Sequence, residues 1–119
     1  MRSFDLAGLA SAFGGEYVLG RKDLNTDACY MIYGLLRGSE AERLIQPGRG
    51  REEILCAVDG PILIHSKGGE VTLKQGHAIH VVEEDSFFIS NPSDRPVVYI
   101  MAGGSSRSHT NKPSTKSAQ

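Results

Sequence analysis

The chain has 119 residues, the length of one small domain, and is long enough to bury a single hydrophobic core. Its 13 basic and 14 acidic residues give a formal net charge of -1, so charge gives no reason to expect a nucleic-acid partner or an anionic membrane surface. Hydrophobic residues make up 39% of the chain, and no apolar run approaches the length of a membrane span.

The secondary-structure pattern begins with one short helix and then changes to strands. Leu6, Leu9 and Phe13 have helical spacing, which predicts a helix within residues 5–13. Short apolar runs separated by turn residues follow. The predicted strands span residues 16–19, 28–36, 41–46, 53–58, 61–66, 70–74, 77–82, 86–90 and 96–101. Asp59-Gly60 is a strong hairpin dipeptide, so residues 61–66 are expected to pair back on residues 53–58.

Eight or nine short, evenly spaced strands predict an all-β sandwich or barrel. The lead-in segment spans residues 1–15 and the barrel domain residues 16–103. Residues 104–119 hold small and polar residues with no large apolar side chain, so a disordered tail is expected there.

Neither the cysteines nor the N-terminus indicates secretion. Cys29 and Cys56 lie in apolar runs, which favours two reduced, buried thiols over a disulfide. Small residues interrupt the apolar stretch from Leu6 to Phe13, so it is a poor secretory signal, and a cytoplasmic location is expected by default.

Two segments resemble the sequence motifs of the cupin family. Glu53, six further residues and Gly60 match the second half of the first cupin motif, and Gly76 and Asn91 match the two ends of the second. The resemblance covers about residues 28–102. It implies a cupin-type double-stranded β-helix, a jelly-roll barrel, and a homodimer. Several strands are apolar on both faces, so their outer faces need cover, for which the candidates are the N-terminal segment and a second subunit.

The resemblance also implies where a cupin metal would bind, through three histidines and one glutamate. The first two histidine positions fall on Gln46 and Gly48, or on Pro47 and Arg49, and the third falls on Phe87. Only Glu53 is kept. One carboxylate does not hold a transition metal against water, so we expect no metal and no cofactor at the standard site.

Other residues offer a relocated site only as an alternative. His77 and His80 are three positions apart, which places them on opposite faces of a strand. His65 could approach one of them across a hairpin. The acidic run Glu83-Glu84-Asp85 is interpreted as a solvated turn rather than a calcium site, because no liganding pattern with a central glycine accompanies it.

The barrel interior is the candidate ligand site. If Glu53 points inward, alternation places Leu55 and Ala57 beside it and Cys56 outside. The candidate ligand-binding residues are Glu53, Phe87, Asn91, Tyr33, Tyr99 and Arg49. Core packing is the alternative role for each aromatic residue. For Glu53 the alternative is a hydrogen bond or a pair with Arg49 or Arg51, because an unpaired buried carboxylate is costly.

The sequence therefore predicts a metal-independent cupin that binds a small molecule or serves as an accessory module. The alternatives are an isomerase or lyase using Glu53 as acid or base, an oxygenase with a metal at His65, His77 or His80, and a structural dimer without a ligand. No phosphate loop and no nucleophile–base pair stands out, so whether the chain is catalytic stays open.

Overall fold

The computed structural model describes residues 1–38 and 40–106. Short strands hold just under half of these residues, in the order that the turn spacing predicts. The elements are α1 (Leu6–Ala12), β1 (Glu16–Leu19), α2 (Arg21–Leu24), β2 (Tyr30–Leu36), β3 (Arg43–Ile45), β4 (Arg51–Ala57), β5 (Ile62–Ser66), β6 (Gly69–Leu73), β7 (Ala78–Val81), β8 (Phe87–Ser90) and β9 (Val97–Ser105). Neither helix is long and apolar enough to cross a membrane within the described ranges.

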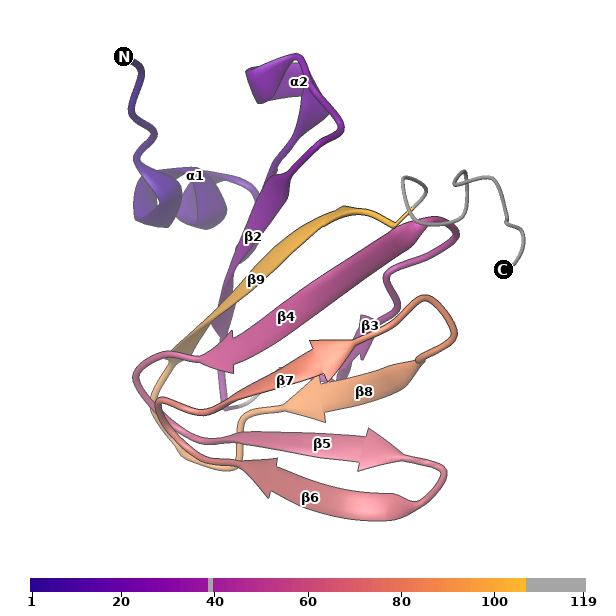
Figure 1. Ribbon diagram of the computed structural model, residues 1–119. Coiled ribbons are helices and arrows are strands. Elements are labelled where there is room, and N and C mark those ends of the chain that lie inside the picture. The colour runs from indigo at the N-terminus through magenta and orange to yellow at the C-terminus, as the bar shows by residue number, and fades with distance from the viewer. Residues whose placement is uncertain (39, 107–119) are drawn as a thin grey trace, which may run out of the picture.

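The strands form two antiparallel sheets (Figure 1). The five-stranded sheet has the order β1-β2-β9-β4-β7, and the four-stranded sheet has the order β3-β8-β5-β6. Helix α1 packs against β1 and β2. The inner faces of the two sheets share one hydrophobic core, which is the arrangement of a jelly-roll barrel and confirms the predicted all-β class.

Strand β4 illustrates why these residues form a barrel wall. Leu55 and Ala57 are fully buried and Glu53 is 6% exposed, whereas Ile54 is 52% exposed. The alternation places the first three residues on the inner face and Ile54 on the outer face, because successive side chains of a strand point to opposite sides. The predicted inward direction of Glu53 is therefore confirmed.

The predicted hairpin at Asp59-Gly60 is wrong. Strand β4 pairs with β7 and β9, whereas β5 pairs with β6 and β8. The Asp59 side chain instead accepts a hydrogen bond of 2.7 Å from the backbone N–H of Val98 on β9. The turn carries the chain from one sheet to the other, a crossing that a local dipeptide does not reveal.

Three further expectations need correction. The one-turn helix α2 was not expected. Strand β9 extends to Ser105, two residues beyond the predicted end of the barrel, because residues 103–105 pair with the start of β4. Both cysteines are free, but neither is fully buried as expected: Cys29 is exposed and Cys56 is partly exposed. The remainder of the predicted tail, residues 107–119, lies outside the described residues.

Candidate functional site

Glu53, the one acid of the cupin pattern that the sequence keeps, has a tyrosine as its partner. The Tyr30 hydroxyl donates a hydrogen bond of 2.5 Å to Glu53 Oε2. The two residues lie on strands separated by β9, where Gly103 stands between them in register. A Cβ at Gly103 would lie 2.5 Å from Tyr30 Cζ, so only glycine lets the ring cross β9. The expected hydrogen bond of Glu53 is therefore present, and its donor is Tyr30 rather than Arg49 or Arg51.

Arg51 completes this arrangement from the same face of β4. Its guanidinium lies 4.9 Å from the centre of the Tyr30 ring, a cation–π contact. Burial, and next the hydrogen bond to Glu53, raise the pKa of the Tyr30 hydroxyl above its ordinary value. Tyr30 thus stays protonated and donates, and Glu53 accepts. We call this group the rim cluster; it consists of Tyr30, Arg51, Glu53 and Gly103.

A shallow hollow of about 360 Å³ is lined by Glu52, Glu53, Ile54, His80, Ala102, Gly103 and Gly104. Two smaller hollows also adjoin the rim cluster. The first, of about 90 Å³, is lined by Val18, Gly20, Arg21, Thr26, Asp27, Cys29, Tyr30 and Arg51. The second, of about 100 Å³, is lined by Asp27, Arg49, Arg51 and Ser105. They share Asp27 and Arg51. The Asp27 carboxylate lies 2.6 Å from the Arg21 guanidinium, whereas neither Arg49 nor Arg51 has an ion-pair partner in the described part of the chain.

The same arrangement recurs about 13 Å further along the strands, at a rise of roughly 3.3 Å per residue. There the Tyr99 ring crosses Gly34 on β2, and the Tyr99 hydroxyl donates to the Glu16 carboxylate on β1. Arg43 donates to the Tyr99 hydroxyl at 2.9 Å. We call this group the base cluster; it consists of Glu16, Gly34, Arg43 and Tyr99.

The tyrosine at the centre of the base cluster is closed to solvent. Tyr99 is fully buried, and a Cβ at Gly34 would lie 2.1 Å from its Cζ. Arg43 forms an ion pair with Glu40 and also donates to the backbone carbonyl of Leu35. Burial, and next Glu16, raise the pKa of the Tyr99 hydroxyl above its ordinary value. These contacts give Tyr99 a structural role. This is the core-packing role that the sequence predicts as the alternative for each aromatic candidate.

Apart from Arg49, the other predicted site residues are not brought together with Glu53. Phe87 lies in the hydrophobic core, 8% exposed. Tyr33 pairs in register with Ile100 and lies on the outer face, because Gly34 and Leu36 occupy the inner one. The expected interior position of Tyr33 is thus corrected. Arg49 lies at the rim, in the hollow that it shares with Arg51.

Asn91 is buried at the opposite end of the barrel. Its Nδ2 donates to the carbonyls of Leu36 at 2.8 Å and Arg95 at 2.6 Å, and its Oδ1 accepts from the backbone N–H and the hydroxyl of Ser93. All its hydrogen-bonding positions are used within the chain, since an amide has two donors and two acceptor sites. Asn91 therefore ties two loops together.

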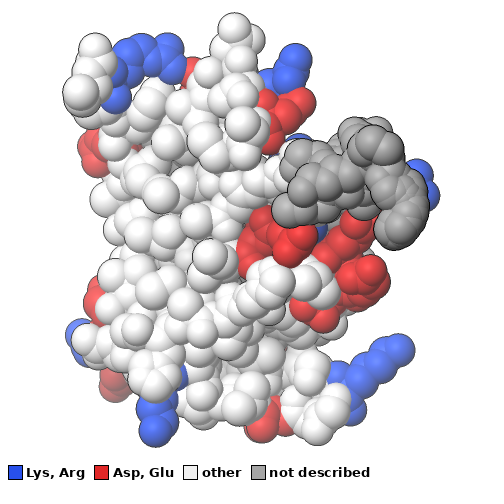
Figure 2. Space-filling model, viewed as in Figure 1, with Lys and Arg blue, Asp and Glu red and all other residues white. Residues whose placement is uncertain are grey.

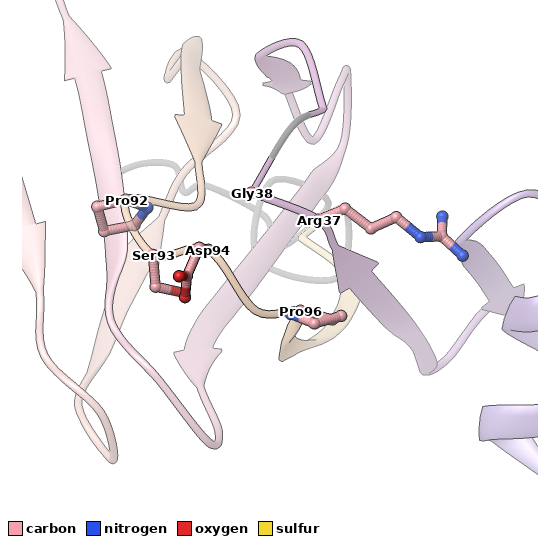
Figure 3. Close-up of a pocket in the computed structure, with 6 residues that line it drawn as sticks. All are labelled: Arg37, Gly38, Pro92, Ser93, Asp94 and Pro96. Atoms are coloured by element: carbon pink, nitrogen blue, oxygen red, sulfur yellow. The ribbon is translucent and has the colours of Figure 1, made fainter.

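Those loops border a larger hollow of about 520 Å³. Arg37, Gly38, Pro92, Ser93, Asp94 and Pro96 line it. The Arg37 guanidinium points away from Ser93 and Asp94, so the charged groups do not converge (Figure 3). A Cβ at Gly38 would lie 2.1 Å from the Ser93 carbonyl, which shows how closely the two loops approach.

The histidines are spread over different faces. His65 is held on the four-stranded sheet, with Nδ1 2.8 Å from Glu70 and Nε2 2.8 Å from the Ser90 hydroxyl. His80 lies on the outer face of the five-stranded sheet, with Nε2 2.7 Å from Glu52. His77 is exposed before β7. Among residues 1–38 and 40–106, no three or more His, Cys, Asp or Glu side chains are grouped to hold a metal ion.

The standard cupin metal does not fit the surroundings of Glu53. Iron, manganese, nickel or zinc would need imidazole ligands beside this carboxylate. Here Glu53 accepts from a protonated phenol, and the cationic Arg51 stacks on the same ring. A second cation would meet a positive charge and no imidazole at this position.

Comparisons with known proteins agree on the architecture. A cupin protein from Bacteroides fragilis superposes on 100% of this chain and 93% of its own, with a TM-score of 0.66 at 16% identity. The chain has the cupin fold. A cupin domain of an XRE-family transcriptional regulator from Enterobacter cloacae matches 76% of this chain and 96% of its own, with a TM-score of 0.55 at 19% identity.

A third cupin structure, described as a sugar phosphate isomerase from Silicibacter pomeroyi, matches 81% of this chain and 63% of its own, with a TM-score of 0.58 at 15% identity. No family model and no curated protein sequence matches the chain. At these identities the similarity establishes the fold, whereas the neighbours' activities differ from one another.

Proposed function

We propose that this cupin barrel is a metal-independent module that binds a small organic molecule at the rim cluster. One observation carries the proposal: Glu53 accepts a hydrogen bond from the Tyr30 hydroxyl, beside the two small hollows lined by Arg49 and Arg51, which have no ion-pair partner among the described residues. A few convergent polar groups beside an aromatic ring are typical of ligand sites. The interior is packed with side chains, which supports a site at the rim rather than deep in the barrel.

Binding at the rim can be mapped by NMR with a panel of small acids, sugars and amides. We expect amide shift changes at residues 30, 49–53 and 103–105, and the same changes in the presence of a chelator. Changes confined to the opposite end, around Pro92 and Pro96, would contradict the rim as the site. Binding that is lost on chelation would contradict metal independence.

A second candidate is an isomerase or lyase that uses Glu53 as acid or base. The observation in its favour is the short hydrogen bond between a buried carboxylate and a protonated phenol, because such a couple can pass a proton. Glu53→Gln distinguishes the two candidates. A binding module keeps affinity for a neutral ligand, whereas an enzyme loses turnover while it still binds.

We also propose a homodimer through the outer face of the five-stranded sheet. Ile54 is more than half exposed there, among half-buried Met31, Tyr33 and Ile100. Figure 2 shows a broad uncharged area on this side of the molecule, with acidic side chains gathered at one edge. Light scattering tests the proposal: the mass should be that of two chains, and Ile54→Asp should halve it. A monomeric native protein would contradict it.

A further inference from the structure

The arginine side chains at the rim differ in their ion pairing. In the described part of the chain, Arg21 is paired with Asp27 and Arg43 with Glu40. Arg49 and Arg51 have no carboxylate within ion-pair distance, and both line the hollow of about 100 Å³. Two arginines and the single carboxylate of Asp27 give this hollow an excess of positive charge, although the net charge of the whole chain is close to zero.

The backbone holds both side chains at the rim. Arg49 lies between Gly48 and Gly50, whose φ angles of 89° and 75° are the left-handed values that glycine adopts without strain. The turn is closed by a hydrogen bond from Arg51 N to the Gly48 carbonyl and tied to β9 by one from Ser106 N to the Gly50 carbonyl. The Tyr30 ring fixes the Arg51 guanidinium by stacking.

The neighbouring carboxylates do not neutralise this pair. Glu53 is occupied by the Tyr30 hydroxyl, and Asp27 lies against Arg21. A planar guanidinium binds carboxylate and phosphate oxygens through two parallel hydrogen bonds, and a fixed one loses less entropy on binding. The adjoining hollow adds the Tyr30 ring and the Val18 side chain, which are apolar contacts.

From this arrangement we infer that the ligand is a small organic anion whose acidic group binds between Arg49 and Arg51 and whose apolar part lies against Tyr30 and Val18. The inference rests on the proposed function and names its ligand class. The two hollows, joined through Arg51 and Asp27, fit an anionic head and a short apolar body on either side of the Arg51 side chain.

Titration of the full chain, after treatment with a chelator, tests the inference with three probes. Benzoate carries a carboxylate, benzamide is its neutral counterpart of the same shape, and inorganic phosphate is an anion without an apolar part. We expect benzoate to bind at least tenfold more tightly than benzamide, and added salt to weaken it. Phosphate that binds as tightly as benzoate would overturn the apolar half of the inference.

Matched variants locate the charge. Arg49→Gln should weaken benzoate binding about tenfold without a loss of fold, because Arg49 is exposed and a hydrogen bond to a charged group is worth roughly that much. Arg95→Gln removes one exposed positive charge at the far end of the barrel and should leave affinity unchanged. Asp27→Asn should strengthen binding, since it removes the acid of the hollow and releases Arg21.

The outcomes separate this inference from the proposed function. Equal binding of benzoate and benzamide at the rim, unaffected by Arg49→Gln, would overturn the inference that the ligand is an anion. It would leave the rim as a ligand site. Shift changes away from the rim for every probe would overturn both. No binding of any of the three probes would overturn the anionic ligand class, while the wider panel of sugars and amides decides whether the rim is a ligand site. An equal loss of benzoate affinity in Arg95→Gln and Arg49→Gln would indicate a general charge effect and overturn the arginine pair.

Discussion

The rim cluster and the base cluster contain the same four residue types in the same arrangement, but their surroundings differ. Each has a tyrosine that crosses a glycine of the central strands to reach a glutamate, and an arginine on the tyrosine. In the base cluster Arg43 has an ion-pair partner and its side chain is 16% exposed. In the rim cluster Arg51 is exposed and unpaired in the described structure.

The two clusters differ in whether the arginine is neutralised by a carboxylate. This difference distinguishes a structural network from a binding site. When the cation is neutralised and buried, the polar groups satisfy one another and stabilise the barrel. When the cation faces a hollow without a counter-ion, its interaction is left for a ligand. Substitutions that treat the two clusters alike should therefore have unlike effects.

The largest difference is expected at the glycines. Gly34→Ala places a Cβ 2.1 Å from Cζ of the fully buried Tyr99, so the ring must leave its site, and we expect a loss of about 3 kcal/mol or more in the free energy of unfolding. Gly103→Ala places a Cβ 2.5 Å from Cζ of Tyr30, which borders a hollow, and 2.9 Å from the Glu52 carbonyl oxygen. These contacts are less severe than at Gly34, so the loss should be smaller. Urea denaturation measures both. Equal losses would contradict the difference between the clusters.

The next largest difference in stability is expected between the two arginine variants. Arg43→Gln leaves Glu40 unpaired in a partly buried site, at a cost of about 1–3 kcal/mol. Arg51→Gln removes a cation–π contact at the surface, which is worth about 0.5–1 kcal/mol. Thermal unfolding of the two variants compares them directly. A larger loss for Arg51→Gln would show that the rim cluster has the structural role.

For the tyrosines we expect the opposite order, with the larger loss of stability in the rim cluster. Tyr30→Phe leaves the carboxylate of Glu53, 6% exposed, without its donor, whereas Glu16 is 38% exposed and reaches water after Tyr99→Phe. A lost hydrogen bond to a charged group costs about 1.5–3 kcal/mol when the group stays buried. We therefore expect Tyr30→Phe to be the more destabilising variant in urea denaturation, and the opposite order would contradict the buried state of Glu53.

The smallest effect is expected in alkaline solution. In the folded state the pKa values of Tyr30 and Tyr99 are raised, so the folded chain keeps protons that the unfolded chain releases near pH 10. The stability contribution is complete below that pH and is lost as pH rises further. Absorbance of the phenolate should show both groups protonated until the chain unfolds. Early ionisation of all four tyrosines would contradict the two hydrogen bonds.

Local pattern was sufficient for the strands and for the direction of Glu53, because alternation depends on neighbours along the chain. It was not sufficient for pairing. The partner of Glu53 lies on β2, and Gly103 on β9 separates them. Which residues face one another across three strands depends on the order of the sheet, and the Asp59-Gly60 turn pointed to the wrong order.

The choice between Tyr30 and Tyr33 illustrates the same limit. The run from Tyr30 to Leu36 is apolar at almost every position, so alternation does not identify its inner face. Gly34 could have done so, because a glycine opposite a buried aromatic marks the face on which the ring lies. That signal requires the register of β2 against β9, which is known only from the folded chain.

Elemental analysis of the native protein, purified without a metal-binding tag, tests the central claim most directly. If the Tyr30 hydroxyl holds Glu53 in place of a metal, iron, manganese, nickel and zinc should all be far below one atom per chain. Stoichiometric metal that is lost in Glu53→Gln would contradict the account.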